Sequence, residues 1–84
     1  MGKYVDVYLP LMGVGSGCIE IKTRNPEVAE LIERKFRIKL KPIYSSFGLA
    51  VYTHTYSGSD KELRKLAGQI GSYMVELEKQ GYLL

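Results

Sequence analysis

Two five-residue segments of this sequence carry side chains that could bind or react with a ligand, Tyr4–Tyr8 (YVDVY) and Tyr52–Tyr56 (YTHTY). Alternate side chains of a β-strand point to opposite faces, so each segment would place two tyrosines on one face with a titratable group between them. That group is Asp6 in the first segment and His54 in the second. The β-branched residues in between suit a buried side. We therefore expect both tyrosine pairs and His54 to face outward.

A run of basic residues with no acid among them is a second feature that could bind a ligand. Arg37, Lys39 and Lys41 alternate with Ile38 and Leu40, which predicts a strand over 37–41 with its basic side chains outward. Aromatic rings stack on unpaired bases and cations pair with phosphates, so a face with both is typical of single-stranded nucleic-acid binding. The leading hypothesis is a small basic nucleic-acid-binding protein whose contact residues are Tyr4, Tyr8, Arg37, Lys39, Lys41, Tyr52, His54 and Tyr56.

The same residues are compatible with a second class of function. Tyrosine is common in strands, and basic side chains often protect an exposed strand edge. The alternative is therefore a protein-interaction or homo-oligomeric assembly module with no nucleic-acid or catalytic role. The 84 residues predict one domain, 1–84, with a small core that self-association would supplement. A homo-oligomer, most simply a dimer, is expected.

An enzyme ranks third, and no catalytic residue is assigned. His54 is the only histidine, and Asp6 could orient its imidazole if the first and fourth strands were neighbours. The sequence shows no spacing of metal ligands, so neither a metal site nor a cofactor is expected. The glycine-rich segment 13–17 joins two strands, whereas phosphate-binding loops open a helix, and it is interpreted as a hairpin turn.

Composition sets the expected environment. The formal charge is +3, and the single cysteine excludes an internal disulfide. No apolar run approaches the roughly 20 residues that span a bilayer, and no secretory signal is visible, so a cytoplasmic protein without a membrane partner is expected. Few amides beside many Lys and Glu residues hint at a thermophilic source.

Hydrophobic periodicity and capping signals predict the strands and helices that carry the candidate residues. Alternation over 3–11 and 18–23 predicts a hairpin, and Asn25-Pro26-Glu27 begins a helix. After the strands at 37–41 and 49–56, Ser59 to Glu62 form a capping box that opens a second helix, which stops at Gly81. Gly68 and Gly71 within that helix suggest close approach of another backbone, from this domain or from a second subunit.

The elements predict an α+β fold, a two-layer sandwich of order β-β-α-β-β-α. Its four-stranded, mainly antiparallel sheet would carry both helices on one face. The strand order is not determined by the sequence. The order 2-1-4-3 would join the two tyrosine segments in one patch, whereas 1-2-3-4 would separate them to opposite edges.

Overall fold

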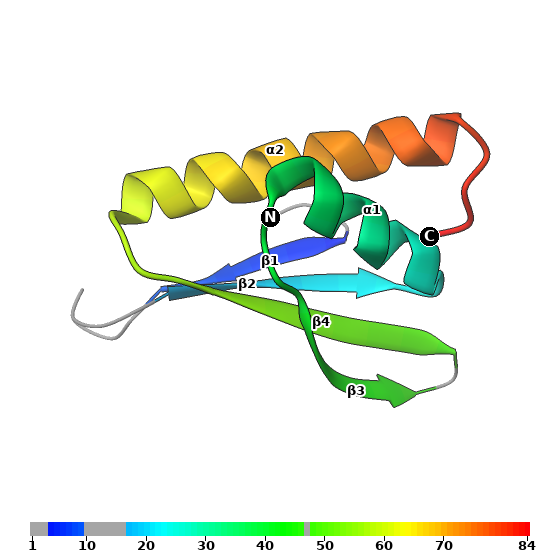
Figure 1. The fold of residues 1–84 in the computed structure, drawn as a ribbon, viewed down its shortest axis with the longest axis horizontal. Coiled ribbons are helices and arrows are strands. Elements are labelled where there is room, and N and C mark those ends of the chain that lie inside the picture. The colour runs from blue at the N-terminus through cyan, green and yellow to red at the C-terminus, as the bar shows by residue number, and fades with distance from the viewer. Residues whose placement is uncertain (1–3, 10–16, 47) are drawn as a thin grey trace.

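The structure of the chain is a computed structural model, and it describes residues 4–9, 17–46 and 48–84. Two strands and a helix follow one another twice, as predicted. The elements are β1 (Val5–Tyr8), β2 (Gly17–Thr23), α1 (Pro26–Phe36), β3 (Lys41–Ser46), β4 (Leu49–Tyr56) and α2 (Asp60–Lys79). Figure 1 shows both helices on the same side of one open sheet. The predicted α+β class with a four-stranded antiparallel sheet is confirmed.

The strand order is β1-β2-β4-β3, with every neighbouring pair antiparallel. The two hairpins meet through β2 and β4, the two longest strands, while β1 and β3 form the edges. Neither order considered from the sequence is the observed one. The two tyrosine-bearing strands, β1 and β4, are separated by β2.

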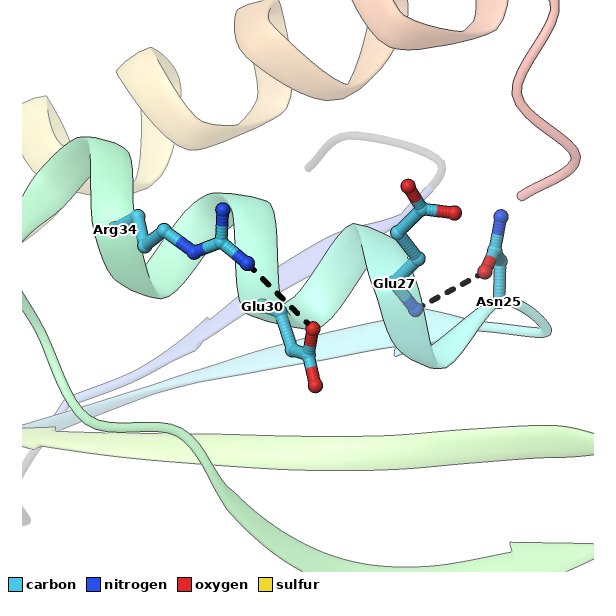
Figure 2. Close-up of polar contacts among 4 residues, drawn as sticks. All are labelled: Asn25, Glu27, Glu30 and Arg34. Atoms are coloured by element: carbon cyan, nitrogen blue, oxygen red, sulfur yellow. Dashed lines mark hydrogen bonds and ion pairs between the residues drawn. The ribbon is translucent and has the colours of Figure 1, made fainter.

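Helix α1 begins at the predicted cap. The side-chain oxygen of Asn25 accepts a hydrogen bond from the amide of Glu27 at 3.0 Å (Figure 2). Pro26 occupies the first turn, where no intrahelical donor is lost. One turn further on, Arg34 approaches Glu30 at 3.8 Å, an exposed pair between residues four apart (Figure 2). The sequence signal for this helix start is therefore confirmed.

The third strand begins later than the sequence predicts. Arg37 adopts the left-handed conformation, with φ of 55°, and ends α1. The amide of Ile38 then donates to the carbonyl of Glu33 at 3.2 Å, which closes the helix end. Residues 38–40 cross to the sheet without belonging to a strand, so the prediction of a strand over 37–41 is wrong. The alternation arises because Ile38 and Leu40 of this irregular connection turn their side chains toward the core.

Strand β3 includes Pro42, a residue type that is rare inside strands. Proline lacks an amide donor and is tolerated at a sheet edge or a bulge. Here both conditions hold, because β3 is an edge strand and its pairing with β4 shifts between Pro42 and Tyr44.

Helix α2 has the caps that its sequence indicates. The hydroxyl of Ser59 accepts a hydrogen bond from the amide of Glu62 at 3.2 Å. At the other end Gly81 has φ of +100°, and the amide of Tyr82 donates to the carbonyl of Leu77 at 3.1 Å. This is the six-to-one bond of a Schellman motif, and the ring of Tyr82 packs against the core.

The core lies between the helices and the central part of the sheet. The inward residues of β1 and β2 meet the apolar stripes of both helices, and most are almost fully buried. The cluster comprises Val5, Ile19, Ile21, Val28, Ala29, Ile32, Leu40, Leu63, Ala67, Ile70, Met74 and Leu77. Val51 of β4 is also buried, but it pairs with Lys22 on the opposite face and lies outside this cluster. The helix-side face of the sheet thus carries the main core, and no helix in the described part of the chain covers the other face (Figure 1).

Several sequence expectations fall beyond the described residues. The end of the predicted first strand at Pro10 and Leu11 is one, and most of the glycine-rich segment, residues 13–16, is another. Within the described ranges, no helix has both the length and the apolar character needed to span a bilayer.

Candidate functional site

Strand β4 turns its tyrosines toward the helix layer, opposite to the prediction. Tyr52 pairs with Ile21 and His54 with Ile19, and both isoleucines have no exposed surface. Tyr52 and Tyr56 also pack against the core. Because the side-chain period of a strand is two, an error of one position reverses every assignment. Thr53 and Thr55 therefore lie on the open face, not the buried one.

The tyrosines of β4 can face the helix layer because the helices cover this strand only in part. The helices contact mainly β1 and β2, so the helix-side positions of β4 are only partly shielded. Tyrosine suits such a position because its ring packs against the core while its hydroxyl remains in contact with water or a polar group. Tyr52, His54 and Tyr56 are all half-buried. Alternation alone cannot distinguish this arrangement from an outward aromatic face.

The tyrosines of the first segment are divided between the two sides. Val5 faces the core, as predicted, and Tyr8 faces away with 49% of its surface exposed. Tyr4 precedes the strand and packs against the core, and its hydroxyl donates to Glu78 of α2 at 2.6 Å. The expected single platform of four tyrosines is therefore not formed.

The open face of the sheet has mixed charge. Lys22 forms an ion pair with Asp6 at 2.9 Å, and the hydrogen bond to that carboxylate raises the pKa of Lys22. Glu20 lies beside Asp6 in the register, and its negative charge raises the pKa of Tyr8. Lys41 also lies on this face, opposite Thr53. The negative charges of Asp6 and Glu20 thus offset the positive charges of the lysines there. This face is not the basic surface that the sequence suggested.

The basic residues and the aromatic row of β4 meet through the connection between α1 and β3. Nδ1 of His54 lies 3.1 Å from the backbone carbonyl oxygen of Lys39. A carbonyl oxygen only accepts, so Nδ1 is the donor. Leu40 is buried, and its amide donates to the carboxylate of Glu33 at 2.9 Å. These contacts anchor the connection to α1 and to β4.

The resulting arrangement is called the connector surface here, and it comprises Arg37, Lys39, Tyr52, His54 and Tyr56. Arg37 and Lys39 are exposed, whereas the three ring-bearing residues are half-buried. The rings of His54 and Tyr56 have centroids 6.4 Å apart and are tilted by 59°. Five of the eight predicted contact residues therefore share one region, while Tyr4, Tyr8 and Lys41 lie elsewhere.

One hydrogen bond restrains a side chain of the connector surface, that of Tyr56. The hydroxyl of Tyr56 donates to the carboxylate of Glu62 in the first turn of α2 at 2.7 Å. That hydrogen bond is the main cause of a raised pKa of Tyr56, with smaller contributions from desolvation and the negative charge of Glu62. The Tyr56 ring is thereby held at the start of α2, with its polar end already occupied.

Asp6 and His54 do not form the acid–base pair considered from the sequence. They belong to strands separated by β2, and alternation places them on opposite faces. Asp6 pairs with Lys22, and His54 contacts the Lys39 carbonyl. Within the described ranges there is also no group of three or more His, Cys, Asp or Glu side chains that could hold a metal ion.

A groove between edge strand β1 and helix α2 is a feature that the sequence did not locate. Its volume is about 450 Å³, and it is partly open to solvent. Small and apolar residues line most of it: Val5, Val7, Gly68, Gly71, Ser72 and Val75. The signal in the sequence was the pair of glycines in α2, yet a Cβ added at Gly68 would meet no atom within 4 Å. Among the described residues, no backbone from outside the helix lies within 4 Å of a Cβ added at either glycine.

No protein family, curated protein or solved structure matches the chain. Fold and site together define a small α+β domain with a basic connector surface on one flank and an apolar groove on the other.

Proposed function

We propose that this protein binds single-stranded nucleic acid through the connector surface. The contact between His54 and the Lys39 carbonyl carries the proposal, because it fixes an exposed basic segment beside a row of aromatic side chains. The nucleic-acid partner is the one expected from the sequence, but the proposed binding surface is a different one. The binding region now lies at β4 and the connection before β3.

The charges in this region are available to an anionic ligand. Arg37 and Lys39 of the connector surface are exposed, as is Lys41, which follows them at the start of β3 on the open face of the sheet. None of the three forms an ion pair with another described residue. Neutralising phosphates releases condensed counterions, which favours binding at low salt. A single strand that contacts the connector surface and extends to Lys41 would make three such contacts, which predict a slope of log affinity against log salt of about −2.

The aromatic row supplies the contacts to bases. Stacking on an aromatic ring contributes about 1–3 kcal/mol per base, and it requires one accessible ring face. Tyr52 and His54 are half-buried, so each retains exposed surface. Duplex nucleic acid keeps its bases stacked internally, and we therefore expect a preference for single strands.

Oligonucleotide titrations at two salt concentrations test this proposal. The wild-type chain should bind single strands more tightly than duplex, and the triple variant R37A/K39A/K41A should lose at least tenfold in affinity. The matched control K61A/K65A/K79A removes the same charge from exposed positions of α2 and should lose much less. Absence of binding at low salt, or equal losses for the two triple variants, would overturn the proposal.

The second candidate is the protein-interaction or homo-oligomeric assembly module. One observation favours it, the apolar groove beside β1, because apolar surface of this kind is stabilised by a partner that excludes water. The two functions use different flanks of the molecule, so they do not exclude each other.

A further inference from the structure

The outer edge of β1 offers unpaired backbone groups next to the groove. The amide of Lys22 donates to the carbonyl of Tyr4 at 2.9 Å, which makes Tyr4 a hydrogen-bonded position of the β1–β2 ladder. Such positions alternate in an antiparallel pair. Val5 and Val7 consequently direct their amide and carbonyl groups to the free edge, and their side chains line the groove.

This edge, although only four residues long, lacks two of the features that usually prevent strand addition. Edge strands are commonly protected by proline, a bulge or an inward charge. The opposite edge, β3, has both Pro42 and a bulge, whereas β1 has neither between Val5 and Tyr8. A strand added to β1 would extend the sheet and place alternate side chains in the groove.

The wall formed by α2 is complementary to itself. Arg64 and Glu78 lie on this wall seven residues before and seven residues after Gly71. Ala67 and Val75 lie four before and four after it. Two copies of α2 crossing antiparallel at Gly71 would therefore pair arginine with glutamate twice and alanine with valine twice. The missing side chain at Gly71 permits close approach at the crossing point.

The strand and the helix imply the same symmetry axis. A Cβ added at Gly71 would lie 4.0 Å from Cγ2 of Val5, so the two residues are opposite each other. A twofold axis that passes near Gly71 thus passes near Val5 as well. At that position two β1 strands would run antiparallel, and the outward amide and carbonyl of Val5 could pair with those of its copy.

We infer that a second copy of this chain occupies the groove, with β1 paired to β1 and α2 packed antiparallel on α2 about a twofold axis near Gly71. Charge complementarity selects this occupant, because Arg64 forms no ion pair within the described residues and the partner's carboxylate would supply one. The inference rests on the assembly candidate and names its partner. It is independent of nucleic-acid binding.

A charge swap tests the arrangement. Arg64 and Glu78 are separated by about 21 Å along α2, so they cannot pair within one chain. R64E or E78R alone should raise the dimer dissociation constant at least tenfold, since the symmetry repeats each unfavourable contact twice. The double variant R64E/E78R should recover to within about threefold of wild type. Sedimentation velocity measures all three against a wild-type mass of twice 9.5 kDa.

Matched controls separate association from folding. K65E and E76R make the same charge changes on the flank of α2 that faces away from the groove, and they should leave the dissociation constant unchanged. Y4F, at another residue that lines the groove, removes the hydrogen bond to Glu78 but keeps the carboxylate charged, so it should raise the dissociation constant far less than E78R does. V75R, at a position already 44% exposed in the single chain, should abolish the dimer without loss of helical circular dichroism.

Two results would overturn the inference. One is a wild-type chain that remains monomeric to millimolar concentration. The other is a double variant that associates as weakly as either single variant. If oligonucleotide binding persists in a monomeric chain, the dimer is wrong and the nucleic-acid proposal stands. If the chain dimerises but binds no oligonucleotide, the nucleic-acid proposal is wrong and the dimer stands.

Discussion

The imidazole Nδ1 of His54 lies 3.1 Å from the backbone carbonyl oxygen of Lys39, and this contact ties the basic connection to strand β4. The connection has no strand partner of its own between residues 38 and 40. Its position therefore depends on the buried side chain of Leu40 and on the hydrogen bonds at each side of it. The same contact that shapes the candidate site also contributes to local stability.

Replacing His54 should loosen this connection. H54A removes a donor to a backbone carbonyl, and the expected decrease in the free energy of unfolding is about 1 kcal/mol. T55A changes an exposed residue on the other face of the same strand and should cost less than about 0.5 kcal/mol. Chemical denaturation measures both values. Amide exchange at Lys39 and Leu40 that stays as slow as in wild type would argue against the anchoring role.

Arg37 should separate stability from ligand binding. Its φ of 55° is unfavourable for any residue with a Cβ, so R37G is expected to stabilise the fold by about 1 kcal/mol. For a domain of this size that corresponds to a rise in melting temperature of roughly 4–8 °C. The same variant should weaken binding to oligonucleotides. R34G, in the last turn of α1, removes the same charge from a residue with helical backbone and is the control, which should destabilise by up to about 1 kcal/mol.

The Tyr56–Glu62 hydrogen bond should be visible in a tyrosine titration. The carboxylate raises the pKa of Tyr56 above 10.0, so E62Q should bring it back toward that value. A raised pKa means that the folded state retains the proton more strongly than the unfolded state. The stabilisation is present below pH about 10 and is lost as the pH rises through the pKa of the folded chain. E76Q, far along α2, is the control, and nuclear magnetic resonance of labelled tyrosine rings resolves the residue concerned.

The two glycines of α2 should respond differently in folding and association. G68A and G71A should each stabilise the single chain by up to about 1 kcal/mol, because added Cβ atoms meet open space or an ordinary contact. Only G71A adds a methyl group at the inferred helix crossing, so it should weaken the dimer more than G68A does. Thermal melts at low concentration and sedimentation at high concentration distinguish the two effects. Equal effects on association would contradict a crossing point at Gly71.

Local interactions explain what the sequence predicted correctly. Caps such as Asn25 and Ser59 act within three residues, and the glycine at 81 meets a backbone requirement of the helix end itself. The apolar periodicity of both helices reflects burial against a sheet, whichever strands lie beneath. Element order and class were therefore accessible from the chain alone.

Only the tertiary structure decided the surfaces. Pairing β2 with β4 separated the two tyrosine segments, and it placed Tyr52 and Tyr56 beside the core because the helices cover β4 incompletely. A left-handed Arg37 turned predicted strand residues into a connection, which carried Lys39 to His54. Strand order and the extent of helix cover depend on contacts between residues distant in the sequence. Local composition and period two cannot specify them, and they determine which side chains meet a ligand.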